Sequence, residues 1–333
     1  MRSHKLLPDP IELAERLLQR DRNAVPQALN LSDDTRPGAR ENALALLDVL
    51  ERELPFPGAA RVGITGAPGA GKSTLLDAFV RILRRRSETV GIVAIDPSSR
   101  ISGGALLGDR VRIRSAAADN GVFIRSMAAR QRLGGLADSA HAAVTILSAV
   151  FDRVFVETVG VGQSESEVAT LVDTLVFVVN PGTGDSLQFM KAGIVELPDL
   201  FVVNKADLGA AAERTAGEVE SGLGISERID NDVRPPVLLV SARDGTGIEA
   251  CVDALDAERE TLVSSGSLVS LRRAQRETFA IECLERRYGS HGVERLGGSN
   301  ALRERARERA AESTFGLVAE LGREIEDALR KPI

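Results

Sequence analysis

Runs of apolar residues alternate with amphipathic stretches through the middle of the chain. Seven short runs, most of them nearly continuous in Val, Ile, Leu and Phe, predict strands that are buried on both faces of a parallel sheet. These strands are expected at 62–65, 89–95, 121–125, 153–158, 174–180, 200–204 and 236–241. Helical periodicity separates them, most clearly at 73–85, 131–149, 185–195 and 247–262. The alternation predicts an α/β fold with a doubly wound, mostly parallel sheet, whose ligands bind at the carboxyl ends of the strands.

The two ends of the chain show helical periodicity only. The division predicted from this pattern is a helical N-terminal extension over 1–60, an α/β domain over 61–265 and a helical C-terminal arm over 266–333. In the arm, two long amphipathic helices are expected on either side of a Gly-rich break, the second with an apolar seam from Leu302 to Leu329. An amphipathic arm fits either a hairpin packed on its own domain or a dimerisation surface.

Composition narrows the class of protein. The net charge of −6 excludes a broad basic field for nucleic acid, and two cysteines cannot form a disulfide framework. Acidic residues interrupt the first 20 residues, where a signal peptide would need an apolar core, and no apolar run approaches the ~20 residues of a membrane span. We therefore expect a cytoplasmic protein that binds neither nucleic acid nor a membrane.

The clearest chemical signal lies between the first strand and the helix that follows it. Gly-Ala-Pro-Gly-Ala-Gly-Lys-Ser fits G-x-x-x-x-G-K-S/T, the phosphate-binding loop of P-loop nucleotidases. Its glycines let backbone N–H groups approach a phosphate, and the helix N-terminus adds partial positive charge. The lysine can reach the outer phosphates, and the serine hydroxyl can bind Mg2+. The residues expected to bind nucleotide here are Gly66, Ala67, Pro68, Gly69, Ala70, Gly71, Lys72, Ser73 and Thr74.

A second motif, N-K-x-D, closes the strand at 200–204. The Asp207 carboxylate can accept hydrogen bonds from the N1–H and the N2 amino group of guanine, and adenine offers no matching pair of donors. Asn204 and Lys205 are expected to brace the loop and cover the base. The next strand is followed by a turn that suits backbone contact with the guanine O6, made of Ser241, Ala242 and Arg243.

Acidic residues at strand ends are candidates for binding Mg2+. Glu157 ends the strand at 153–158, Asp96 ends the second strand, and Asp109 follows in a Gly-rich segment. Mg2+ keeps several waters and takes one or two protein carboxylates, so the three cannot all bind it directly. The usual GTPase has Asp where this chain has Glu157, which leaves direct and water-mediated binding open. Gln163 either orients the attacking water or is merely solvated.

Together these motifs resemble the MeaB/ArgK-type GTPases, which act as chaperones of adenosylcobalamin-dependent methylmalonyl-CoA mutase and its relatives. The resemblance rests on Thr65–Thr74, Ala94–Ser99, Glu157–Glu165 and Asn204–Asp207, which follow in order along the chain. It makes Glu157 a family trait, and it favours dimerisation for the C-terminal arm.

The resemblance implies a slow GTPase that docks on the mutase and gates loading of intact cofactor and removal of damaged cofactor. It implies that Mg2+ is surrounded by Ser73, Asp96, Asp109 and Glu157, and that hydrolysis involves Lys72, Asp96, Glu157 and Gln163. The expected partners are GTP and GDP, Mg2+, the mutase and a second copy of the chain. No tightly bound cobalamin is expected on this chain.

Two other functions compete with this interpretation. A nickel-insertion GTPase needs clustered His and Cys ligands, whereas His4, His141 and His291 are far apart in the sequence. The family has also been labelled a transport-system kinase, but a guanine-reading motif is unexpected in a protein that phosphorylates a receptor with ATP.

The two nucleotide motifs make a direct prediction about ligand selectivity. Calorimetry should show that the purified chain binds GDP and discriminates against ADP, because Asp207 can pair only with guanine. Equal binding of ADP, or no binding of GDP, would contradict the assignment of both motifs.

Overall fold

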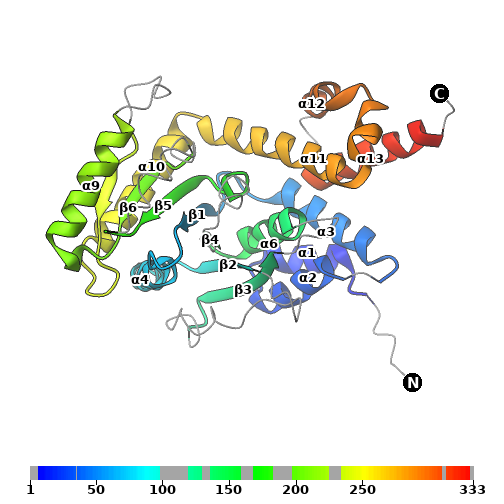
Figure 1. The fold of residues 1–333 in the computed structure, drawn as a ribbon. Helices are drawn as coiled ribbons and strands as arrows, with labels where there is room; N and C mark the ends of the chain where they lie inside the picture. The colour runs from blue at the N-terminus through cyan, green and yellow to red at the C-terminus, as the bar shows by residue number, and fades with distance from the viewer. Residues whose placement is uncertain are drawn as a thin grey trace. The chain divides into compact units, whose positions relative to one another are not determined.

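The computed structural model describes residues 7–34, 36–97, 119–129, 136–158, 168–182, 197–224, 234–309 and 313–330 (Figure 1). The chain forms two compact units. The α/β unit consists of Ala60–Ala129 and Asp152–Ser267, and the helical unit consists of Met1–Ala59, Arg130–Phe151 and Leu268–Ile333. The three-part division expected from the sequence stays a prediction. The structure adds that the stretch beginning at Arg130 groups with the two ends of the chain.

Seven parallel strands form one sheet in the order β3-β2-β4-β1-β5-β6-β7. The strands are β1 (Ala60–Gly66), β2 (Val90–Pro97), β3 (Val122–Ala129), β4 (Arg153–Thr158), β5 (Thr174–Val179), β6 (Leu200–Val203) and β7 (Val237–Leu239). Each lies where the apolar runs predicted a strand, so the doubly wound parallel sheet is confirmed. Because β1 is central, its carboxyl end lies between the ends of β4 and β5, where such sheets bind ligands.

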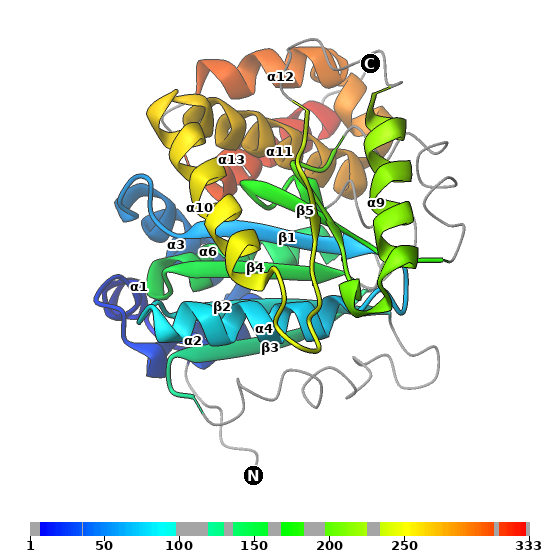
Figure 2. The same ribbon diagram turned by 90° about the vertical axis from the view of Figure 1, so that its left-hand side faces the viewer.

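Helices of the α/β unit cover both faces of this sheet. Side chains alternate between faces along a strand, so β5 and β6 each contribute to two apolar clusters. One face packs against α4 (Lys72–Arg85) and α10 (Ile248–Ser264), which lie across the same side of the strands in Figure 2, and it includes Val176, Val178, Leu200 and Val202. The other packs against α9 (Ala210–Leu223) and includes Phe177, Val179, Phe201 and Val203.

Ion pairs hold the amino end of the sheet, opposite the expected site. Arg153, at the start of β4, is buried, and its guanidinium donates to Glu88 Oε2 at 2.8 Å and to Asp256 on α10. Burial alone would lower the pKa of Arg153, but hydrogen bonds to these two carboxylates raise it overall. These ion pairs therefore fix the amino end of β4, the strand that carries Glu157 near its carboxyl end.

The helical unit contains α1 (Pro10–Leu18), η1 (Arg22–Ala24), α2 (Val25–Ser32), α3 (Ala39–Glu53), α6 (Leu136–Val150), α11 (Ser267–Glu294), α12 (Gly298–Glu308) and α13 (Thr314–Arg330). Local signals explain its first helix: Pro10 opens α1, and the Asp9 carboxylate accepts the N–H groups of Ile11 and Glu12. Helix α6 packs against α1, α2 and α3. Helical structure at both ends of the chain is thus confirmed. Among the described residues, no helix is both long and apolar enough to cross a membrane.

The expected second helix of the C-terminal arm is wrong in one respect, because it is two helices. Helix α12 ends at Glu308 and α13 begins at Thr314. The Ser313 hydroxyl accepts the N–H of Gly316 at 3.0 Å, which is how a serine caps the start of a new helix. On α11, Ala274 is exposed, whereas Phe279 is buried.

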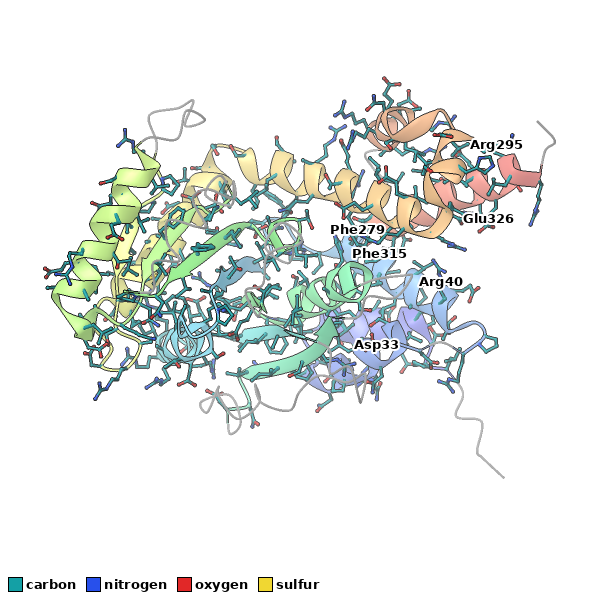
Figure 3. The ribbon with its side chains drawn as sticks, in the orientation of Figure 1. Asp33, Arg40, Phe279, Arg295, Phe315 and Glu326 are labelled. Carbon is teal, nitrogen blue, oxygen red and sulfur yellow. The ribbon has the colours of Figure 1, made fainter. Side chains whose placement is uncertain are left out.

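The apolar seams of α11, α12 and α13 face one another. Their shared core consists of Ala280, Ile281, Leu284, Val293, Leu302, Ala306, Leu317, Leu321 and Ile325. Phe279 of α11 and Phe315 of α13, both labelled in Figure 3, pack around His141 of α6. Their ring centroids lie 4.1 and 5.4 Å from that of the imidazole. The seams are therefore buried within a single chain.

This aromatic cluster predicts a stability difference between two positions on α11. Phe279→Ala is expected to lower the free energy of unfolding by about 3–5 kcal/mol, because it leaves a cavity beside His141 and Phe315. Val269→Ala is the matched control on the same helix, since Val269 is 54% exposed. Chemical denaturation followed by circular dichroism measures both, and equal effects would contradict the packing described.

Candidate nucleotide-binding site

The phosphate-binding loop lies at the carboxyl end of β1 and leads directly into α4. Gly66, Gly69 and Gly71 have φ angles of 134°, 80° and 88°, which side chains disfavour. A Cβ on Gly66 would lie 2.1 Å from the carbonyl oxygen of Val178, and one on Gly71 would lie 2.5 Å from Asn204 Nδ2. Two of the motif glycines are thus required both by backbone conformation and by close contacts.

Lys72 is buried at the start of α4. Its ammonium donates to the carbonyl oxygens of Gly66 at 2.7 Å and Ala67 at 3.0 Å. A buried ammonium needs such partners, because removing it from water is costly. The positive charge is thereby held inside the curve of the loop, at the amino end of α4.

Two residues that are 84 positions apart in sequence meet beside this loop. The Ser73 hydroxyl donates to Glu157 Oε1 at 2.7 Å, and both side chains are buried. The strand register explains the contact, because Glu157 on β4 lies directly beside Ile64 on β1. A hydroxyl and a carboxylate are hard oxygen donors, so this pair suits the ligand chemistry of Mg2+.

The other acidic candidates are placed only in part. Asp96 lies at the carboxyl end of β2, where its backbone is beside that of Ala128. Register also places Glu157 between Ala94 of β2 and Ile64 of β1, so the ends of the three strands lie next to one another. Asp109 and Gln163 lie outside the described residues.

The Asn204 side chain joins three loops. It follows β6 and is buried, its Nδ2 donates to the carbonyl oxygen of Ala70 at 2.8 Å, and its Oδ1 accepts the N–H of Ala242 at 3.1 Å. The adjacent Lys205 donates to the carbonyl oxygen of Gly69 at 3.0 Å. The phosphate-binding loop, the N-K-x-D loop and the turn after β7 are therefore hydrogen-bonded to one another.

Asp207 is held from the turn after β7. The Ser241 hydroxyl donates to Asp207 Oδ1 at 2.9 Å, and the Arg243 guanidinium lies 3.5 Å from Oδ2. Ser241 is fully buried, while the Arg243 side chain is 85% exposed. The sequence suggested only backbone contacts to the base for this turn. The side-chain contact from Ser241 was missed, because a serine after a strand carries no signal of its partner.

Comparison with known proteins agrees with this arrangement. A family model described as methylmalonyl Co-A mutase-associated GTPase MeaB matches residues 25–294. The chain belongs to the MeaB family. Its members are named GTPases, so the chain is a GTPase, and the family implies binding of a guanine nucleotide and Mg2+.

Similar proteins carry related names. The chain is 43% identical to a putative GTPase of Pyrococcus abyssi over 80% of this chain and 81% of that protein. It is 38% identical to the GTPase ArgK of Escherichia coli, over 79% and 80% of the two chains. It is 36% identical to the methylmalonic aciduria type A homolog of Mus musculus, over 79% and 66%. A crystal structure of a LAO/AO transport system kinase matches with a TM-score of 0.67 and 28% identity, covering 95% of this chain and 97% of that one.

The bridge made by Asn204 predicts a loss of nucleotide affinity when it is removed. Asn204→Ala should weaken GDP binding by about tenfold or more. It leaves the Ala70 carbonyl oxygen and the Ala242 N–H without their hydrogen-bond partner, which costs about 1–3 kcal/mol for each buried group. Asn204→Asp keeps the acceptor for Ala242 but sets an oxygen against the Ala70 carbonyl, so it should bind GDP no better. Calorimetry measures both.

Asn300→Ala on α12, an exposed position in the helical unit, is the control. If Asn204→Ala bound GDP as tightly as the unchanged protein, the three-loop bridge would have no part in binding.

Proposed function

We propose that this GTPase acts as a chaperone of an adenosylcobalamin-dependent acyl-CoA mutase of the methylmalonyl-CoA mutase type. In this role it gates the loading of intact cofactor and protects the mutase from damaged cofactor. The proposal has two parts, a set of residues that carry the nucleotide chemistry and a partner enzyme. The single observation that carries the first part is the contact between Ser73 and Glu157 beside the phosphate-binding loop.

Residues 66–74 bind the phosphates of the nucleotide. The glycine turn leads directly into the amino end of α4, where backbone N–H groups and the helix dipole favour negative charge. The Lys72 ammonium exchanges the carbonyl oxygens of Gly66 and Ala67 for phosphate oxygens when the nucleotide enters. Phosphoryl transfer needs mainly positioning and charge stabilisation, and this loop supplies both.

Ser73 and Glu157 hold Mg2+, together with Asp96 and Asp109 directly or through water. When bound, Mg2+ neutralises charge that develops on the outer phosphates. The already close pair of Ser73 and Glu157 supports this assignment, because its oxygens are the donors that Mg2+ prefers. Gln163 is assigned to orienting the attacking water by its place in the sequence alone.

Asp207 reads the guanine base. The Ser241 hydroxyl holds one carboxylate oxygen, which fixes the direction in which the other lone pairs point. Lys205 lies on the phosphate-loop side of the base position, where its aliphatic stem covers the ring while its ammonium stays bonded to Gly69. Backbone groups of Ala242 and Arg243 complete the base site.

The proposed partner is taken from the names of the family and of one relative. The family is described as associated with methylmalonyl-CoA mutase, and the mouse relative is named for methylmalonic aciduria. A homodimer is part of the proposal through the family alone. The apolar seams of α11, α12 and α13 pack on one another within the chain, so the proposed dimer uses surfaces of the C-terminal arm outside these seams.

A transport-system kinase is the second candidate, since the matched crystal structure carries that name. It would transfer phosphate to a protein from ATP. The guanine-reading arrangement of Asp207 with Ser241 favours hydrolysis of GTP instead. Nickel insertion has no comparable support, because it needs clustered His and Cys ligands and His4, His141 and His291 are far apart in the sequence.

The chaperone proposal predicts that the mutase changes the rate of GTP hydrolysis. Single-turnover hydrolysis should rise roughly 5- to 150-fold when purified adenosylcobalamin-dependent methylmalonyl-CoA mutase is added, the usual span of a coupling between two sites. Lys72→Ala is the matched variant, which should lose hydrolysis but still bind the mutase in a pull-down with GDP.

A pull-down from native lysate, with GDP and with a non-hydrolysable GTP analogue, tests the partner independently. Recovery of no cobalamin enzyme in either nucleotide state, with no change of rate in the purified system, would contradict the chaperone role. The GTPase activity itself would stand.

A further inference from the structure

A pair of buried threonines links the two strands that carry the site. Thr158 Oγ1 donates to Thr65 Oγ1 at 3.0 Å, and the two side chains are 1% and 0% exposed. Thr65 is the last residue before the glycine turn, and Thr158 directly follows Glu157. The bond therefore connects the residue that leads into the phosphate-binding loop with the residue that leads away from the carboxylate.

The position of this bond is informative because the strand pairing ends just before it. The register between β1 and β4 runs from Ala60 and Arg153 to Ile64 and Glu157. Beyond that pair, β1 continues only beside β5, through Thr65 and Gly66. The threonine hydroxyls thus make the next connection between β1 and β4, at the point where the two chains begin to separate.

The threonines lie on the face opposite to Glu157. Side chains alternate along a strand, and Phe155 and Ile64 belong to the core beneath α4, so Glu157 lies on that face and Thr158 on the other. A hydrogen bond on the far face resists rotation of the two strand ends about their axes. Such a rotation would move the Glu157 carboxylate away from the Ser73 hydroxyl, which is now 2.7 Å from it.

Packing alone does not require hydroxyl groups at positions 65 and 158. Valine has nearly the same shape as threonine, and valine is the commonest residue in the strands of this sheet. Burying a hydroxyl is unfavourable unless it is bonded, and replacing both partners of a buried hydrogen bond by apolar groups of the same shape is close to neutral for stability. Two valines would pack as well as the two threonines, but they could not form the hydrogen bond that holds the strand ends in one orientation.

We propose that Thr65 and Thr158 are positioning residues for GTP hydrolysis, which hold Glu157 against Ser73 at the magnesium site. The inference rests on the proposed roles of Ser73 and Glu157. It adds to the site two residues outside the set proposed to bind the nucleotide and Mg2+.

The test compares Thr65→Val, Thr158→Val and the double variant under saturating GTP. The double variant should lose about tenfold or more in kcat, since small misplacements of reacting groups carry costs of this size. Its affinity for GDP and its melting temperature should stay close to those of the unchanged protein, while half-maximal activity should need more Mg2+. Each single variant strands one buried hydroxyl and should melt at a lower temperature than the double variant.

Two further variants make the result specific. Thr158→Ser keeps the hydroxyl and should retain kcat. Thr174→Val replaces a buried threonine at the amino end of β5 in the same sheet and should leave hydrolysis unchanged.

Either of two results would overturn the inference: a double variant with unchanged kcat and Mg2+ dependence, or a serine variant as impaired as Thr158→Val. Glu157→Gln and Ser73→Ala, assayed alongside, separate this failure from failure of the magnesium site. If both of those hydrolysed GTP normally, the site assignment and the inference would fall together. If both were impaired while the double valine variant was not, only the inference would fall.

Discussion

The candidate site depends on one buried amide, that of Asn204, which fixes the N-K-x-D loop against the glycine-rich loop after β1 and the turn after β7. Its donor and acceptor are both used, by Ala70 on one side and Ala242 on the other. Gly71 is pressed against the same amide, so the contact is close in shape as well as in hydrogen bonding. In the proposed site a nucleotide spans these loops, and loops without the bridge would have to be ordered by the ligand itself, at a cost in affinity.

The parallel sheet makes this bridge possible. The carboxyl ends of all seven parallel strands lie on the same side of the sheet, so residues that follow β1, β4 and β6 converge although they are far apart in sequence. At the amino ends of the strands, Arg153 is paired with the carboxylates of Glu88 and Asp256. The amino end of the sheet is therefore fixed by ion pairs, and the carboxyl end by hydrogen bonds among loops. In the proposed site, a ligand replaces some of the hydrogen bonds at the carboxyl end.

Much of this could be predicted from the sequence because it follows from local constraints. Strands buried on both faces are nearly continuous in apolar residues, and such runs located the strands, even β7 at the edge of the sheet, which is only partly buried. The glycine turn carries its own spacing. The predictions that failed concern packing partners. Nothing in the apolar pattern distinguishes one long helix from α12 and α13, since the seam continues across the break, although Ser313 was a visible cap. Likewise, the contacts of Ser241 with Asp207 and of Thr158 with Thr65 depend on strand register, which a single sequence does not give.

The helical unit is assembled from three stretches that are widely separated along the chain. Helix α3 packs against α13, Asp48 and Glu51 of α3 bond to Ser313 and Thr314, and α6 arrives from the middle of the sequence. During synthesis the N-terminal helices emerge first, yet α6, which packs against all three of them, comes much later in the sequence, and α13, which packs against α3, comes later still. This unit can therefore complete its core only after α6 and α13 have both been synthesised, so its first helices stay partly uncovered while most of the α/β unit is made.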